Sequence, residues 1–186
     1  SLNFIRRFFM KRFTKGLIAF LAVIIASVSL YALSAGQSVS NVTIKDANDN
    51  PATIPDFGTK VLTIFYNDAE AADISDPMSD ALKAKNYPET KTRGIGIANL
   101  KDSVAPNWVI RKIVQSKIKK YNSTILTDVD LTLAKSWGLG YCNNKSICII
   151  IGKDSKVKYI KYMDKNNPPS QADIDYVVKL VGDLIK

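Results

Sequence analysis

Two cysteines are the residues best suited to covalent chemistry, and the chain has no histidine to assist them. Cys142 and Cys148 are separated by five residues, a spacing that matches no redox or metal motif. Three interpretations stay open: a structural disulfide, a buried core thiol at Cys148 with Cys142 free, or a redox couple. The lack of histidine excludes Ser-His-Asp triads, Cys-His dyads and histidine-ligated zinc.

A group of acidic residues is the second feature that could take part in catalysis or binding. It comprises Asp68, Glu70, Asp73, Asp76 and Asp80. These acids precede and open a predicted helix, where the helix dipole favours negative charge. We therefore interpret them as helix-terminal charge rather than as a metal or acid–base site, and we expect no metal and no other cofactor.

The segment 41–54 contains an apparent calcium motif. Asp46, Asn48 and Asn50 have the spacing that opens an EF-hand loop. Pro51, however, stands where that loop requires glycine, and Phe57 stands where it requires a bidentate glutamate. The segment therefore predicts a β-hairpin with a solvated turn, not a calcium site.

The first 35 residues are typical of a targeting segment. Five basic residues lie within positions 1–15, and the apolar run Leu17–Leu33 follows them without a charge. The run fits a signal peptide cleaved after Ser34 or Ala35, or a short membrane anchor. We expect an exported, periplasmic or membrane-anchored protein, with 1–35 as the targeting segment and 36–186 as the folded domain.

The charge outside the targeting segment is mild. The whole chain carries a net charge of +9, but residues 36–186 contribute 21 basic and 17 acidic residues, a net of +4. No DNA- or RNA-binding motif accompanies this balance. We therefore expect no nucleic-acid partner, and membrane contact only through an uncleaved N-terminal segment.

Apolar periodicity predicts alternating strands and helices. Strands are expected at 61–66, 93–100, 124–126, 147–151 and 157–163, and helices at 77–85, 106–121, 130–137 and 170–186. Together with the N-terminal hairpin, this order predicts an α/β fold: a three-layer sandwich with a central mixed sheet flanked by helices.

The helix at 106–121 has a basic outer face. Its expected core stripe is Val109, Ile110, Ile113, Val114 and Ile118, and its expected outer residues are Arg111, Lys112, Lys117, Lys119 and Lys120. A solvated face is the ordinary interpretation, and a surface for an anionic partner is the alternative. We expect Trp108 and Trp137 to serve in packing.

The segments GTKVLTIFY, TILTDVDLTLAKSWGLG and ICIIIGKDSKVKYI, in this order, resemble the thioredoxin fold in its redoxin form. The stretch from Ala81 to Tyr121 is similar to the YtfJ family of exported bacterial proteins. The resemblance implies a reactive cysteine in the turn after the first central strand and a cis-proline before the third. Here that turn, Asn67–Asp73, has no Cys, Ser or Thr, and the segment Asn143–Ser146 has no proline.

These departures favour a non-catalytic thioredoxin-like domain that binds a protein partner in the cell envelope. The alternative is a weak thiol-disulfide or peroxide-handling protein that uses Cys142 and Cys148. Ligands of open α/β sheets gather outside the carboxyl ends of the strands. The candidate binding surface is therefore Asp68, Glu70, Asp73, Lys101, Asp102 and Lys145.

Overall fold

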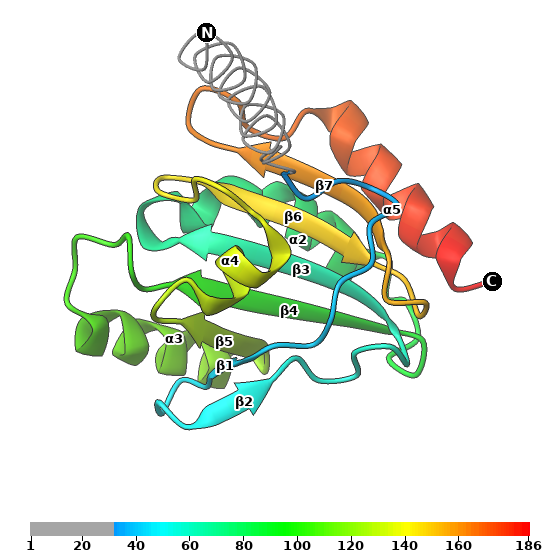
Figure 1. Cartoon of the computed structure of the whole chain (residues 1–186). Helices are drawn as coiled ribbons and strands as arrows, with labels where there is room; N and C mark the ends of the chain where they lie inside the picture. The colour runs from blue at the N-terminus through cyan, green and yellow to red at the C-terminus, as the bar shows by residue number, and fades with distance from the viewer. Residues whose placement is uncertain (1–31) are drawn as a thin grey trace, which may run out of the picture. The chain divides into compact units, whose positions relative to one another are not determined.

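The apolar run that begins at Val61 forms strand β3 (Val61–Asp68), in which every residue except Asn67 is buried. The computed structural model describes residues 32–186, and β3 lies inside its seven-stranded mixed sheet (Figure 1). The strand order is β2-β1-β5-β4-β3-β6-β7, with β3, β4 and β5 parallel and the other pairs antiparallel. The other strands are β1 (Thr43–Lys45), β2 (Pro51–Thr53), β4 (Thr92–Asn99), β5 (Thr124–Asp128), β6 (Ser146–Ile151) and β7 (Val157–Met163).

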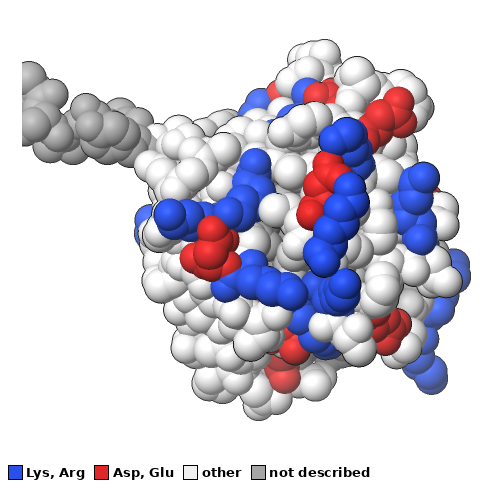
Figure 2. All heavy atoms as spheres, turned by 90° about the vertical axis from the view of Figure 1, so that its right-hand side faces the viewer, with Lys and Arg blue, Asp and Glu red and all other residues white. Residues whose placement is uncertain are grey.

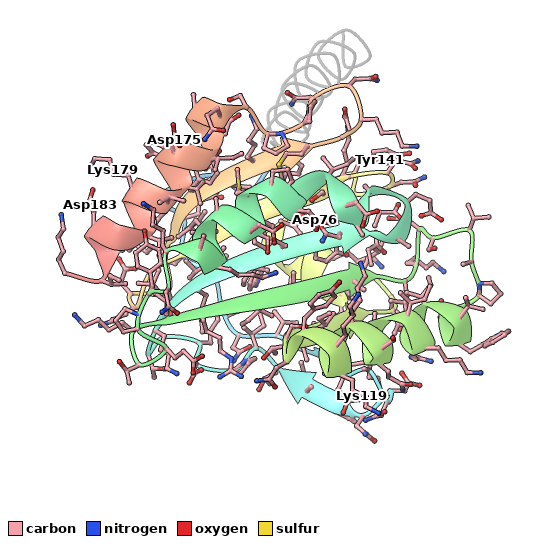
Figure 3. All side chains as sticks on the ribbon, turned by 180° about the vertical axis from the view of Figure 1, so that it is seen from behind. Asp76, Lys119, Tyr141, Asp175, Lys179 and Asp183 are labelled. Carbon is pink, nitrogen blue, oxygen red and sulfur yellow. The ribbon has the colours of Figure 1, made fainter. Side chains whose placement is uncertain are left out.

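Helices cover both faces of the sheet, which confirms the predicted three-layer α/β architecture. The short helix α4 (Thr132–Trp137) lies over one face (Figure 1). The other face carries α2 (Asp76–Ala84), α3 (Asn107–Tyr121) and α5 (Gln171–Leu184) (Figure 3). A 3-10 helix, η1 (Ala69–Ser75), connects β3 to α2.

Alternation along β6 makes this strand part of two of the three apolar clusters of the described domain. Ile147 and Ile149 pack with Leu133 and Trp137 of α4 on one face. Cys148 and Ile150 point to the opposite face, where they join residues of α2 and α5. Because successive strand side chains point to opposite faces, one strand contributes to both of these clusters.

Local capping signals place the helix ends close to their predicted positions. Ser170 caps α5 in a reciprocal capping box with Asp173. Gly138 ends α4 in the left-handed conformation, with a φ of 68° that glycine adopts without strain. Within α3 two expectations are wrong: Ile113, expected in the core, is 51% exposed, and Trp108, expected to serve in packing, is 62% exposed. The inward strip of this helix is narrower than predicted and consists of Ile110, Val114 and the half-buried Ile118.

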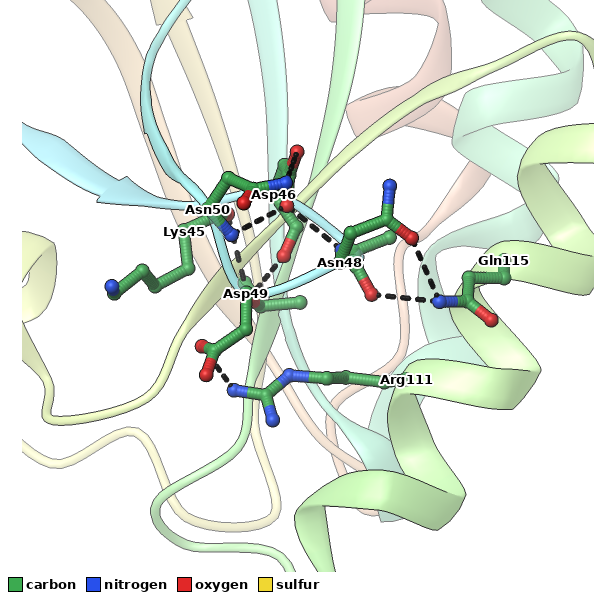
Figure 4. Close-up of polar contacts among 9 residues, drawn as sticks. Lys45, Asp46, Asn48, Asp49, Asn50, Arg111 and Gln115 are labelled. Carbon is green, nitrogen blue, oxygen red and sulfur yellow. Dashed lines mark hydrogen bonds and ion pairs between the residues drawn. The ribbon is translucent and has the colours of Figure 1, made fainter.

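The N-terminal hairpin at β1 and β2 is confirmed, and its turn is docked on α3 (Figure 4). The carboxylate of Asp46 accepts hydrogen bonds from the backbone N–H groups of Asn48 and Asn50, at 2.8 and 2.9 Å. Asp49 pairs with Arg111 of α3, and Gln115 donates to the Asn48 side chain at 3.0 Å. The polar side chains of this turn therefore fix the position of the turn relative to α3.

The targeting segment predicted at 1–35 lies largely outside the described residues. Its last residues are described and belong to the folded unit: Leu33 is buried, and its N–H donates to the carbonyl of Gly138 at 3.0 Å. Within residues 32–186, no helix has the length and apolar character needed to cross a membrane.

Candidate functional site

Three polar residues form a row at the carboxyl ends of the parallel strands. Asp68, Asn99 and Asp128 are the last residues of β3, β4 and β5, and the strand registers place Asp68 opposite Asn99 and Asn99 opposite Asp128. All three are fully buried, at 0% exposure. Burial of polar groups is costly unless they are hydrogen-bonded, so their partners determine the structure of this end of the sheet, here called the carboxyl edge.

Asp128 connects the sheet to α4. Its Oδ2 atom accepts hydrogen bonds from the Tyr66 hydroxyl and from the backbone N–H groups of Leu133 and Ala134, each at 3.1 Å. It therefore caps the start of α4 from inside the core. Burial raises the pKa of the Tyr66 hydroxyl far above its usual value, and the Asp128 charge raises it further.

Asn99 shapes the loop after β4. Its Oδ1 atom accepts from the backbone N–H groups of Lys101 and Asp102, at 3.0 and 3.3 Å. Its Nδ2 atom donates to the Asp102 carboxylate at 2.7 Å. These bonds turn the chain at the carboxyl edge and hold Asp102 beside the polar row.

Asp68 joins the two segments that would carry the redoxin site. Its Oδ2 atom accepts from the backbone N–H of Asn144 at 2.6 Å, and its own N–H donates to the carbonyl of Lys145 at 3.0 Å. Asn144 has a positive φ of 55°, a conformation that asparagine tolerates better than most residues. The turn after the central strand and the loop before β6 therefore meet, as the thioredoxin resemblance implies, but they meet through a carboxylate.

The carboxyl groups of Asp68 and Glu70 interact directly. Burial, and after it the hydrogen bond with Glu70, raise the pKa of Asp68 to about 6, although the backbone N–H groups of Asn144 and Glu70 act in the opposite direction. That same bond lowers the pKa of Glu70. Glu70 is exposed and also accepts from the Ser103 hydroxyl and the Val104 N–H, at 3.3 and 3.2 Å. A pair of interacting carboxyl groups therefore occupies the place of a redoxin nucleophile.

The two cysteines are free thiols buried in different apolar clusters, Cys142 with the α4 face and Cys148 with the opposite face. Burial raises the pKa of Cys142 to about 12, and the charges of Asp102, Asp128 and Asp68 add to the effect. Burial also raises the pKa of Cys148. Both environments disfavour the thiolate, the form that performs thiol chemistry.

The structure brings some of the expected binding residues together and separates others. Asp68, Glu70 and Asp102 lie at the carboxyl edge. The Lys145 backbone is also there, but its ammonium group pairs with Asp164 beyond β7. Asp73 is exposed, with an oxygen 3.9 Å from the Lys117 ammonium of α3. The Lys101 backbone is bonded to Asn99, and its side chain is exposed to solvent.

Asn99 and the buried position of Asp128 were not predicted as parts of a site. A signal was present, since an Asp or Asn lies within two residues of the end of each of the three predicted strands, but it becomes specific only once those strands are known to be adjacent and parallel. Within the described residues, no cluster of three or more acidic, cysteine or histidine side chains is suitable for holding a metal ion. Residues 32–186 also contain no cis peptide bond.

Solved structures with the thioredoxin fold resemble this chain over most of its length. A peroxiredoxin-like protein from Aquifex aeolicus has a TM-score of 0.59 and 15% identity, over 83% of this chain and 89% of its own. A putative thiol:disulfide interchange protein DsbE from Chlorobium tepidum has a TM-score of 0.59 and 11% identity, over 83% and 100%. The pneumococcal exposed lipoprotein thioredoxin Etrx1 from Streptococcus pneumoniae has a TM-score of 0.56 and 10% identity, over 78% and 100%.

These likenesses confirm the predicted thioredoxin-like fold. No curated protein matches the chain by sequence. A family model described as "Bacterial protein of unknown function (YtfJ_HI0045)" matches residues 58–184, which include β3 to α5 and the whole polar row. Since this match covers more than half of the chain, the protein belongs to the YtfJ family.

Proposed function

We propose that this protein is an exported thioredoxin-fold binding module that recognises a protein partner in the cell envelope through its carboxyl edge. The observation that carries the proposal is that a pair of carboxyl groups stands at this edge, where a redoxin has its reactive thiol. Redoxins need a thiol whose pKa is lowered there, whereas this chain has the Asp68–Glu70 pair and a buried Cys142 with a pKa raised to about 12.

Exposed apolar side chains beside the polar row support a binding role. Val104, in the loop held by Glu70, is 91% exposed, and Tyr141, in the loop before β6, is 72% exposed. Both loops adjoin the carboxyl edge, because Val104 follows β4 and Tyr141 precedes β6. Tyrosine is a common anchor of protein-recognition surfaces, and loops on a rigid scaffold commonly carry such anchors.

The basic and apolar character of residues 1–35 supports export. Etrx1, which is described as an exposed lipoprotein, has the same fold. Sequencing the N-terminus of the protein recovered from cells tests this part: a chain that begins near residue 35 or remains membrane-bound fits export, and a full-length cytosolic chain contradicts it.

The binding function is tested by capture of a partner from envelope extract with four versions of the chain. We expect the wild type and a Cys142→Ser, Cys148→Ser variant to retain the same partner. A Val104→Ser, Tyr141→Ser variant should lose it. Tyr176→Ser is the matched control, because Tyr176 is 53% exposed on α5, away from the carboxyl edge.

Thiol chemistry is the outcome that would overturn the proposal. The wild type and the double-cysteine variant are compared for reduction of insulin disulfides and for consumption of peroxide. Equal, background rates for the two proteins support binding without catalysis. A rate that depends on Cys142 or Cys148 would contradict it and favour the redox alternative.

A further inference from the structure

The outer face of α3 combines lysines with exposed apolar side chains. Helix α3 contains no acidic residue, and five of its residues are Arg or Lys. On its surface Trp108 is 62% exposed, Ile113 is 51% exposed and Tyr121, at its C-terminal end, is 58% exposed. These three large apolar side chains are not buried within the domain, and a purely solvated face, as expected from the sequence, gives no reason for their presence.

The basic residues of α3 divide into two groups. Arg111 pairs with Asp49 of the hairpin turn (Figure 4), and Lys117 lies 3.9 Å from Asp73. Lys112, Lys119 and Lys120 form no ion pair with any carboxylate among residues 32–186. The charge of the outer face is therefore not neutralised within the described domain.

Aromatic rings and ammonium groups are adjacent along this face. The Lys112 ammonium lies 5.1 Å from the centre of the Trp108 ring, and the Lys120 ammonium lies 5.0 Å from that of Tyr121. A shallow groove of about 420 Å³ runs along the helix between lysines and apolar side chains. Its lining is Lys112, Ile113, Ser116, Lys117, Lys120 and Tyr121.

Helix α5, which covers the same face of the sheet, has a different surface. Its Lys179 pairs with Asp183, and Asp175 adds another acid (Figure 3). On the side of the domain that carries α5, basic and acidic side chains are interleaved (Figure 2). The acid-free charge of α3 is therefore a local property of this helix.

We propose that α3 lies on an anionic lipid bilayer, with Trp108 and Ile113 at the level of the headgroups and Lys112, Lys119 and Lys120 against the lipid phosphates. Charge complementarity identifies the occupant, because lysines without acids face an anionic surface favourably. Large apolar side chains between the lysines distinguish a bilayer from a purely ionic partner. The helix presents about 22 Å of rigid surface, at about 1.5 Å per residue.

The two tryptophans allow a test with the full chain. Trp108 is exposed on α3, whereas Trp137 is 4% exposed and donates its Nε1–H to the carbonyl of Ser40. The full chain is added to vesicles of phosphatidylcholine with one fifth phosphatidylglycerol, both with brominated acyl chains, and to neutral brominated vesicles. Residues 1–35 contain no tryptophan, so quenching reports lipid contact at Trp108 and not contact of that segment.

We expect quenching on the anionic vesicles that disappears in 1 M salt, on neutral vesicles and in Trp108→Phe. Each lysine near a charged membrane contributes about 1 kcal/mol, or about fivefold in binding. A variant with Lys112, Lys119 and Lys120 changed to Gln should thus bind the anionic vesicles about two orders of magnitude more weakly, as measured by the lipid concentration needed for half-maximal quenching. Ile113→Ser should weaken it without changing its salt dependence.

A control triple with Lys85, Lys153 and Lys165 changed to Gln removes the same charge from exposed sites away from α3. It should be quenched as the wild type is. Equal loss in the two triple variants would overturn the proposal, because total charge would then explain the effect. An absence of quenching on anionic vesicles, or equal quenching on neutral ones, would also overturn it.

Discussion

Replacement of Asp68 by Asn should remove a pH dependence of stability that the wild type shows between pH about 4 and 6. An asparagine cannot ionise, but its amide oxygen can accept the bond from the Asn144 N–H, now 2.6 Å from the Asp68 carboxylate. Its amide group can also donate to Glu70. The variant therefore resembles the wild type with Asp68 protonated.

The direction follows from the shifted pKa of Asp68. Its folded value is about 6 and its ordinary value is 3.8, so between these pH values the folded state holds a proton that the unfolded chain has lost. The stabilisation from Asp68 is complete below pH about 4 and is lost as the pH rises through 6. A shift of this size corresponds to at most about 3 kcal/mol. The lowered pKa of Glu70 has the opposite sign, and acts mainly below pH about 4.5.

Urea denaturation at pH 4.5, 5.5, 6.5 and 7.5 measures this effect. The unfolding free energy of Asp68→Asn minus that of the wild type should rise with pH and reach about 1–3 kcal/mol at pH 7.5. Asp73→Asn, at an exposed acid nearby, is the control and should show no such rise. The chain has no histidine, so no imidazole can imitate this titration. A pH-independent difference between Asp68→Asn and the wild type would refute the reasoning.

Three further predictions concern stability and thiol reactivity. Asp128→Ala leaves the Tyr66 hydroxyl and two helix N–H groups without an acceptor, so it should lower the unfolding free energy by about 3–5 kcal/mol. The control Asp130→Ala, at an exposed acid, should change the unfolding free energy by less than about 0.5 kcal/mol. Equal urea midpoints for the two variants would contradict this prediction. A chain that begins at Gly36 lacks the buried Leu33 side chain and the hydrogen bond from its N–H to Gly138. It should be about 2–3 kcal/mol less stable than a chain that begins at Ala32. Identical melting curves would show that Leu33 contributes nothing to stability. Alkylation of Cys142 and Cys148 by iodoacetamide at pH 7.5 should be at least about 100-fold slower in the folded protein than in urea, because burial raises both pKa values; rapid labelling of the folded protein would contradict the burial of the thiols.

The fold was predictable because its signals are local. The apolar run at Val61–Tyr66 is too continuous for a surface strand, and in the structure it is buried on both faces. Ser170 and Asp173 have the spacing of a capping box, and they form one at the start of α5. Each of these signals depends on residues within one helix or strand, so no knowledge of the tertiary structure was needed.

The site was only partly predictable because it depends on strand register. Asp68 and Glu70 follow the first central strand and were identified from that position. Asn99 lies 31 residues beyond Asp68, and only the parallel pairing of β3 with β4 places the two opposite each other. Asp128 lies just before the predicted helix that it caps, but its burial beside Tyr66 depends on how β5 and α4 pack.

The exposed face of α3 shows a limit of helical periodicity. Apolar spacing places Ile113 near the inward stripe, but spacing does not say how wide the covering surface is. The hairpin turn and β5 contact only a strip of α3, so Ile113 and Trp108 project beyond it. An apolar residue at the margin of a stripe is therefore ambiguous between core and interface until the neighbouring elements are placed.

The two proposed surfaces meet in the loop from Lys101 to Pro106. Glu70 holds this loop at Ser103 and Val104, and α3 begins immediately after it, at Asn107. A domain that rests on a bilayer through α3 would therefore present its carboxyl edge close to the membrane, where an envelope protein is available as a partner. The two activities should nevertheless be separable. Asp68→Asn should leave the lipid quenching of Trp108 unchanged, and the α3 lysine variant should still capture the partner in solution. Loss of both activities in either variant would mean that one surface, not two, carries the function.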